Sequence, residues 1–307
     1  MAHASLPIDI DQAMLHAWPL PMPSPDSDKE GRGHVLIVGG SREMPGAVIL
    51  AATAALRAGA GKLTIATGRS VAQLVALALP EARVIGLAET DRGGFSDDAA
   101  TVLAPLAGKI AAILVGPGMQ DEDAAAALVH ALLAELAGND VSVILDACAM
   151  ATISCPPDAQ APFRFAQPVV VTPHAGEMAH LSRLDKDAIH ADVDRHAHDA
   201  AARWNAVVAL KGARTVVAAP DGTVWQHVGG NIGLATSGSG DTLAGIIAGL
   251  AARGATLEQA TCWGVALHAL AGQQLALRFG QMGYLAREIP AEIPALLEQI
   301  GATRSDG

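Results

Sequence analysis

Short apolar runs alternate along the chain with longer segments in which apolar residues recur at helical spacing. The short runs predict buried strands, because they are too brief for helices and are rich in valine and isoleucine. The predicted strands cover residues 35–38, 63–66, 111–115, 143–145, 169–171 and 207–210. The predicted helices lie near residues 46–58, 70–80, 121–137, 176–183 and 190–204. Such alternation is typical of βαβ units, so we predict an α/β fold with a mostly parallel central sheet covered by helices.

The pattern changes in the last third of the chain. Two apolar runs, 215–219 and 223–227, flank the sequence "PDGT" and predict a hairpin at the sheet edge, because Asp-Gly favours a tight turn. The following apolar residues fall on one face of a helix that starts near residue 241: Leu243, Ile246, Ile247 and Leu250. Further helices are predicted over residues 257–278 and near 287–299.

Neither an internal repeat nor a long linker divides the chain. One domain over residues 29–303 is therefore the economical interpretation, with residues 1–28 as a lead-in. The N-terminus lacks a cationic lead and carries Asp9 and Asp11, so we expect no signal peptide. No apolar run approaches the ~20 residues that a membrane helix needs, so no membrane partner is expected.

Composition narrows the function further. The net charge of −11 argues against nucleic-acid binding, which needs a basic face. The three cysteines, Cys148, Cys155 and Cys262, lack the number and spacing of a disulfide framework or zinc site, and indicate reduced thiols in a cytoplasmic protein. Alanine and glycine dominate, which suits close packing of helices. Alanine-rich helices can also pack against a second copy, so we expect a homo-oligomer, possible sizes including a tetramer.

The stretch "NIGLATSGSGDTLAGIIAGLAARG" (231–254) carries the strongest chemical signal. Gly238, Ser239 and Gly240 lead into Asp241 at the start of an apolar helix. Asp241 as a simple helix cap is the alternative, but a capping acid needs no glycine loop before it. The N–H groups of such a loop and helix start bind phosphate, and an adjacent carboxylate can accept a proton from a hydroxyl.

Other strand ends also carry glycine or polar residues: "VGGS" (38–41), "VGPGM" (115–119), Asp146, His174 with Glu177, and Lys211. Each has an ordinary explanation as a turn, a helix cap, a loop histidine or a solvated lysine. Because the carboxyl ends of parallel strands share one edge, their coincidence favours a common cleft. Neither the dinucleotide fingerprint G-x-G-x-x-G nor the P-loop motif is present at these positions.

Taken together, these stretches resemble the ADP/ATP-dependent NAD(P)H-hydrate dehydratases of the ribokinase-like superfamily. The matching sequences are "KEGRGHVLIVGGSREMPGAVILAATAALRAGAGKLTIAT", "VGPGM", "VTPHAGEM", "LKGART", "GNIGLATSGSGDTLAGIIAGLAARG" and "ALHALAGQQLALRFGQMGYLA". The resemblance spans residues 29–298. It implies a three-layer α/β/α sandwich and a cofactor-repair lyase that dehydrates hydrated NADH or NADPH at the expense of ADP or ATP. The ring hydroxyl would be phosphorylated and then leave as phosphate.

The resemblance also implies roles for individual residues. Asp241 would be the catalytic base and contact the hydrated dinucleotide, with Ala47, Gly118 and His174 as further substrate contacts. Mg²⁺ would accompany the nucleotide, and Glu177 would support the site through its neighbours. The residues implied in nucleotide binding are Lys211, Gly212, Ala213, Arg214, Thr215, Gly238, Ser239 and Gly240.

Three positions depart from the family pattern. Cys148 replaces an acid in "DACAM", Ile232 replaces a proline after Asn231, and Ala175 replaces a proline after His174. An epimerase domain is not expected before residue 29, so the substrate would be the one hydrate epimer that the dehydratase accepts, the S form.

Three alternatives remain open at this point. A ribokinase-like small-molecule kinase would use the same Gly-Ser-Gly-Asp chemistry and release a phosphorylated product. A second alternative is a nucleotide-binding protein without turnover, inactive because Cys148 replaces the usual acid. An NAD-linked dehydrogenase is disfavoured by the missing dinucleotide fingerprint.

Overall fold

The computed structural model describes residues 6–24, 26, 28–156 and 163–301. These residues form a ten-stranded sheet with the strand order β1-β10-β9-β8-β7-β6-β5-β2-β3-β4. The strands are β1 Ile8–Asp9, β2 His34–Val38, β3 Lys62–Gly68, β4 Arg83–Leu87, β5 Ala112–Val115, β6 Ser142–Leu145, β7 Val169–Val171, β8 Ala206–Leu210, β9 Arg214–Ala218 and β10 Val224–Val228. The seven strands from β4 to β8 in this order are parallel, as predicted, and β9 is antiparallel to both of its neighbours.

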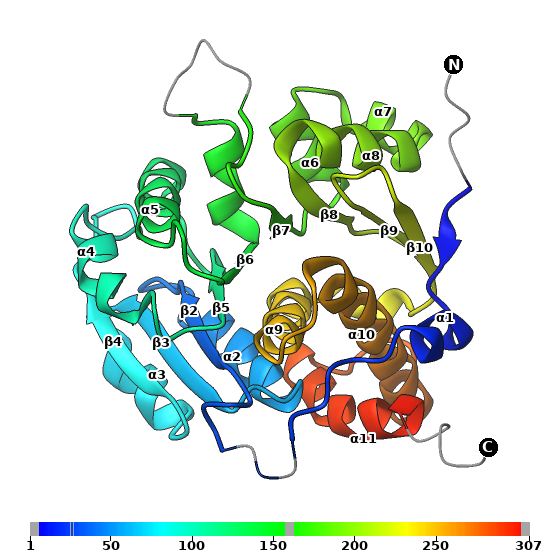
Figure 1. Cartoon of the computed structure of the whole chain (residues 1–307), viewed down its shortest axis with the longest axis horizontal. Helices are drawn as coiled ribbons and strands as arrows, with labels where there is room; N and C mark the ends of the chain where they lie inside the picture. The colour runs from blue at the N-terminus through cyan, green and yellow to red at the C-terminus, as the bar shows by residue number, and fades with distance from the viewer. Residues whose placement is uncertain (1–5, 25, 27, 157–162, 302–307) are drawn as a thin grey trace.

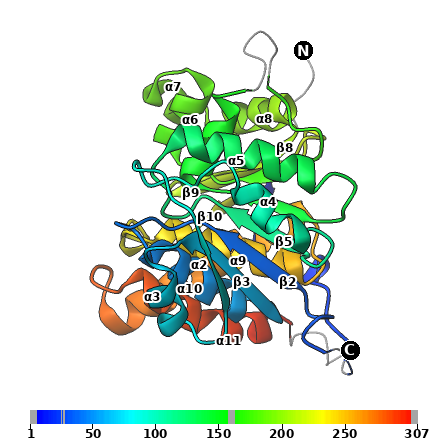
Figure 2. The ribbon, with the colours of Figure 1, turned by 90° about the vertical axis from the view of Figure 1, so that its left-hand side faces the viewer.

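Helices cover both faces of the sheet and produce a three-layer sandwich (Figures 1 and 2). The α-helices are α1 Gln12–Ala17, α2 Gly46–Arg57, α3 Ala72–Ala78, α4 Ala99–Leu103, α5 Glu122–Glu135, α6 Ala175–Ser182, α7 Lys186–Ala191, α8 Val193–Trp204, α9 Ser239–Ala252, α10 Leu257–Phe279 and α11 Ile289–Gly301. Helices α4 to α8 lie on one face, and α2, α3, α9, α10 and α11 lie on the other. Within the described ranges, no helix combines the length and apolarity needed to cross a bilayer.

Alternation along the strands divides the hydrophobic core between the two faces. In β2, Val35 and Ile37 join the cluster under α2 and α9, whereas Leu36 and Val38 join the cluster under α5 and α8. Successive strand side chains point to opposite faces, and both faces here are buried. Continuous apolar strands therefore follow from burial on both sides.

The N-terminal segment extends the sheet beyond the predicted hairpin. Strand β1 pairs in parallel with β10, and the Ile10 carbonyl accepts a hydrogen bond of 2.8 Å from His227 Nδ1. The prediction that the hairpin forms the sheet edge is therefore wrong, because β1 covers β10. Residues 1–5, 25 and 27 of the expected lead-in, and 157–162 and 302–303 of the expected domain, lie outside the described residues.

Glycines set the distance between α2 and α9. A methyl group at Gly245 would lie 2.1 Å from the Ala51 carbonyl oxygen, and one at Gly249 would lie 2.4 Å from that of Ala55. Only hydrogen fits at these two positions, so the backbones of the helices pack directly together. This contact fixes where the N-terminus of α9 lies.

Gly245→Ala is expected to destabilise the protein by at least about 2 kcal/mol, because the added methyl forces the two helices apart. Gly301→Ala in α11 is the matched control, since a methyl there meets nothing within 4 Å. Urea unfolding of both variants measures the difference. Equal stability of the two variants would contradict the close packing.

Candidate functional site

The site begins where the strand order reverses, between β2 and β5. Both strands end in glycine loops that pack on each other: Gly40 N–H donates to the Pro117 carbonyl at 2.6 Å. Gly118 has φ +70, and a methyl on it would lie 2.9 Å from Ala47 Cβ. Ala47 and Gly118 are therefore neighbours, at the position where open α/β sheets usually bind ligands.

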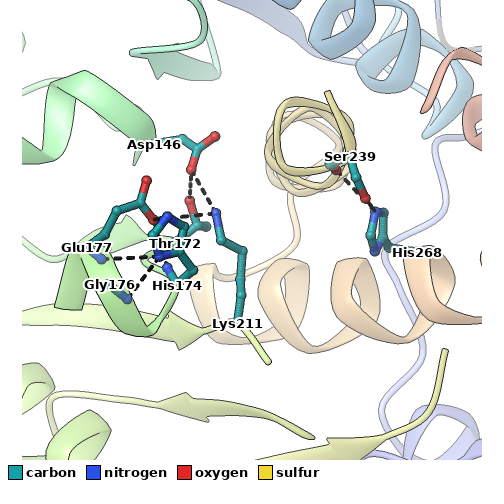
Figure 3. A network of polar contacts seen from close by, with 8 residues as sticks. All are labelled: Asp146, Thr172, His174, Gly176, Glu177, Lys211, Ser239 and His268. Atoms are coloured by element: carbon teal, nitrogen blue, oxygen red, sulfur yellow. Dashed lines mark hydrogen bonds and ion pairs between the residues drawn. The ribbon is translucent and has the colours of Figure 1, made fainter. Parts of the chain in front are cut away.

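A buried polar cluster follows along the same edge, at the ends of β6, β7 and β8 (Figure 3). Asp146 Oδ1 accepts hydrogen bonds from Thr172 Oγ1 at 2.6 Å and from Lys211 Nζ at 3.3 Å. Lys211 Nζ also lies 3.9 Å from Glu177 Oε2. The predicted convergence of strand ends is thus confirmed for Asp146, Glu177 and Lys211.

Lys211 stays charged in this cluster. Burial lowers its pKa, but the carboxylates of Asp146, Glu177 and Asp241 more than offset that effect, so the pKa lies above its usual value. The Lys211 backbone N–H donates to the Pro173 carbonyl at 2.8 Å, which joins it to the strand end that carries His174.

His174 caps helix α6. Its Nδ1 accepts from the backbone N–H of Gly176 and Glu177 at 3.0 and 3.2 Å, while Glu177 Oε2 accepts from the His174 N–H at 2.7 Å. These donors assign the proton of the neutral ring to Nε2. The side chain is 58% exposed, so Nε2 remains accessible to a ligand.

Helix α9 opens on the glycine loop. Gly238, at φ +86, is its N-cap, and no side chain caps this end. Asp241 lies in the first turn, and within the described residues its carboxylate makes no hydrogen bond to this helix start, so the simple capping explanation is wrong. Burial, followed by the charge of Asp146, raises the pKa of Asp241 to about 7, and Lys211 counteracts the rise. Such a carboxyl is half-ionised near neutral pH, where a general base works best.

A cavity of about 810 Å³ lies beside this helix start. Its walls come from the β8–β9 turn, the loop before α9, the first turn of α9, and α10. Six of the predicted nucleotide-binding residues line it: Lys211, Gly212, Ala213, Thr215, Ser239 and Gly240. His174, at the neighbouring strand end, also lines it.

Arg214 and Gly238 do not line this cavity. The Arg214 guanidinium points to the other face of the hairpin, where Nη1 donates to Asp194 at 2.6 Å and to Gln226 at 2.8 Å. Gly238 instead packs on α2, since a methyl on it would lie 2.4 Å from Leu50 Cδ1. Gly238 contributes the left-handed backbone conformation that sets the direction of the loop before α9.

Cys148 lies in a separate cavity of about 240 Å³, which Glu177, Met119 and Met150 also line. Burial and the charges of Glu122 and Asp121 raise the pKa of this thiol to about 12. The thiol is therefore protonated at neutral pH and does not replace the charge of an acid. Ala147, which precedes it, has φ +47, a strained value for a residue with a side chain.

Two polar residues at the site escaped the sequence analysis. Thr172 orients Asp146, and its only signal was its place between a strand and "PH" in the chain. His268 lies in the middle of α10, with Nε2 3.0 Å from Ser239 Oγ. A lone histidine in an alanine-rich helix gives no indication of its partner. Among the described residues, no group of three or more acid, histidine or cysteine side chains forms a metal cage.

Comparisons with known proteins agree with this geometry. A sequence model of the NAD(P)H-hydrate dehydratase family matches residues 35–295. An ADP-dependent (S)-NAD(P)H-hydrate dehydratase of Xanthomonas campestris pv. campestris is 49% identical, over 95% of this chain and 96% of that protein. The bifunctional NAD(P)H-hydrate repair enzyme of Moorella thermoacetica is 40% identical over 87% of this chain, which matches 50% of its length.

A solved structure is also similar over nearly the whole chain. It is the ADP/ATP-dependent NAD(P)H-hydrate dehydratase from Bacillus subtilis, co-crystallised with ATP and Mg²⁺. The TM-score is 0.82 at 30% identity, and the match covers 97% of this chain and all of that one. The ribokinase-like sandwich implied by the sequence is confirmed.

Asp241→Asn is expected to stabilise the fold above pH 7. The folded-state pKa of about 7 exceeds the unfolded value of about 3.9, so the folded protein binds more protons and loses stability as pH rises through this window. Allowing for solvent screening, the variant should gain roughly 1–3 kcal/mol over the parent at pH 8.5. Below pH 4 the two should agree. Urea unfolding at both pH values measures this, and a constant difference would contradict the raised pKa.

Proposed function

Because this chain belongs to the NAD(P)H-hydrate dehydratase family, we propose that it dehydrates the S epimer of hydrated NADH or NADPH, using ADP or ATP. The reaction is a carbon–oxygen lyase reaction that restores the reduced nicotinamide ring. One observation carries the proposal: a half-buried carboxyl with a pKa of about 7 lies in a glycine-flanked helix start beside a nucleotide-sized cavity.

Asp241 is the base in this proposal. It accepts the proton of the ring hydroxyl, whose oxygen then attacks the terminal phosphorus of the nucleotide and displaces AMP from ADP, or ADP from ATP. The bond between the ring carbon and that oxygen then breaks, so phosphate leaves, and the neighbouring ring carbon loses a proton to solvent as the double bond forms again. The N–H groups of Gly240 and Asp241, in the first turn of α9, lack partners within the helix, so they stabilise the charge that develops on the phosphoryl oxygens.

The nucleotide occupies the cavity of about 810 Å³ in our proposal. Its phosphates extend toward Lys211 and Gly240, since a methyl group at Gly240 would lie 3.5 Å from Lys211 Nζ. Gly212, Ala213 and Thr215 line the part of the cavity farther along the hairpin. Arg214 contributes through its ion pair with Asp194, which holds the hairpin in place, rather than through contact with the nucleotide.

The hydrated dinucleotide binds along the rest of the sheet edge, on Ala47, Gly118 and His174. The small residues Ala47 and Gly118 allow close approach of the ligand to the backbone. His174 offers its Nε2–H as a donor. In this proposal the ring hydroxyl lies between Asp241 and the phosphates.

Mg²⁺ accompanies the nucleotide in this proposal, and the donor set fits it. Mg²⁺ keeps several waters and takes one or two carboxylates together with substrate phosphates. Asp146 and Glu177, which face Lys211, would hold it through water. When bound, it offsets phosphate charge.

Cys148 does not argue against turnover. It lies in its own cavity, and the residues that set the pKa of Asp241 do not include it. We propose an active enzyme rather than a nucleotide-binding protein without turnover.

The proposal includes a cytoplasmic homo-oligomer. Supporting evidence comes from α3, where Leu74 is 62% exposed and Leu77 is 81% exposed. Burying two such leucines against a second copy removes apolar surface from water.

The decisive assay uses purified protein with NADH hydrate, Mg²⁺ and ADP or ATP, and follows recovery of the reduced-nicotinamide absorbance. Asp241→Asn is expected to lower kcat at least about hundredfold, because the hydroxyl loses its proton acceptor. Nucleotide affinity should change little, since the glycine loop survives. Near-parent kcat in the variant would remove Asp241 from the role of base.

The pH dependence provides a separate prediction. Parental kcat/KM should fall about tenfold per pH unit below pH 7, as Asp241 becomes protonated. Asp146→Asn removes a charge that raises the pKa of Asp241, so this acid limb should move to lower pH. Glu122→Gln is the control, because Glu122 does not contribute to that pKa. An unmoved limb in the Asp146 variant would contradict the assignment.

A further inference from the structure

A buried histidine contacts the first residue of α9 from the neighbouring helix. His268 Nε2 lies 3.0 Å from Ser239 Oγ and 3.1 Å from the Ser239 carbonyl oxygen (Figure 3). Ser239 is only 5% exposed, and both residues line the cavity assigned to the nucleotide. The contact joins α10 to the loop that would bind phosphate.

The two distances assign the proton of the imidazole. A carbonyl oxygen can only accept, so Nε2 must carry the hydrogen and donate it. The other tautomer would set the Nε2 lone pair against the carbonyl lone pairs. Burial lowers the pKa of His268 to about 4, which keeps the ring neutral at physiological pH.

This assignment determines what the serine hydroxyl can do. The Nε2–H lies within reach of Oγ as well as of the carbonyl, so Oγ acts as an acceptor toward His268. The hydroxyl hydrogen of Ser239 is then available to donate to another acceptor. Within the described part of the chain, Ser239 Oγ makes no other hydrogen bond.

We propose that His268 is a positioning residue, which holds Ser239 so that its hydroxyl donates to a phosphoryl oxygen of the bound nucleotide. Ser239 lies between Gly238 and Gly240, two residues before Asp241, at the helix start. A hydroxyl donor there adds to the backbone N–H groups around the transferring phosphate. This inference rests on the proposed function.

If the contact between His268 and Ser239 only holds α9 and α10 together, the variants should behave differently. A double-mutant cycle distinguishes the two roles. The variants are Ser239→Ala, His268→Leu and both together. If His268 acts through Ser239, each single change should lower kcat at least about tenfold, and the double variant should be no slower than Ser239→Ala alone. His268→Gln, whose amide N–H can replace Nε2–H, should recover most of the loss.

Parent-like kcat in His268→Leu, or losses that multiply in the double variant, would overturn the proposal. Thr261→Ala is the matched control, because Thr261 is a buried polar residue of α10 whose hydroxyl donates to the Leu257 carbonyl within the same helix. It should lower Tm without lowering kcat. If His268→Leu does not fold, His268→Ala takes its place in the cycle.

Titration calorimetry with ATP and adenosine separates this proposal from the dehydratase function. Ser239→Ala and His268→Leu should weaken ATP binding and leave adenosine binding unchanged, because adenosine lacks the phosphates. An inactive parent that still shows this pattern would overturn the dehydratase proposal alone. Equal weakening for both ligands would overturn the role of His268.

Discussion

The site depends on the ammonium group of Lys211, whose positive charge offsets the repulsion among three neighbouring carboxyl groups. Without Lys211, Asp146, Glu177 and Asp241 would meet at one sheet edge as uncompensated like charges, which burial penalises heavily. The compensation is unequal. Lys211 bonds Asp146 directly, whereas Asp241 keeps a pKa of about 7 and is left partly able to hold a proton. The positive charge of Lys211 therefore both stabilises the folded sheet edge and influences the pKa of Asp241.

That charge balance requires α9 to be held close. Its first turn reaches Lys211 only because Gly245 and Gly249 let the helix lie directly on the backbone of α2. The abundance of glycine and alanine in the sequence thus has a specific use. Small residues between two helices set the position of the proposed base, Asp241, at the end of one of them.

The regular part of the fold was predictable because each parallel strand is buried on both faces and reads as an apolar run. Strand β4 was missed, since Gly86 interrupts a short run that is only partly buried. The predicted helix over 190–204 is confirmed as α8, which starts at Val193 because the Asp192 side chain accepts from the Arg195 N–H, whereas α7 before it was missed. Strand β1 was unpredictable locally, as its partner β10 lies more than 200 residues along the chain.

The sequence correctly predicted that Asp146, Glu177 and Lys211 lie close together, because the carboxyl ends of parallel strands share one edge of the sheet. Side-chain direction was harder. Arg214 belongs to a matching motif, yet it alternates with Thr215 along β9 and points to the opposite face. The contact between His268 and Ser239 needed the packing of two helices, which neither helix encodes by itself.

The hydrogen bond between the Ile10 carbonyl and His227, a residue that lines the cavity proposed for the nucleotide, spans 217 positions. During synthesis the first strand of the sheet has no partner until β10 has left the ribosome. Closing so long a loop lowers the conformational entropy of the chain before the contacts between β1 and β10 can form and offset that loss. The wall of the cavity is thus completed only after β10 and the lining residues of α10, up to Ala269, have been made, so a chain truncated before them cannot assemble it.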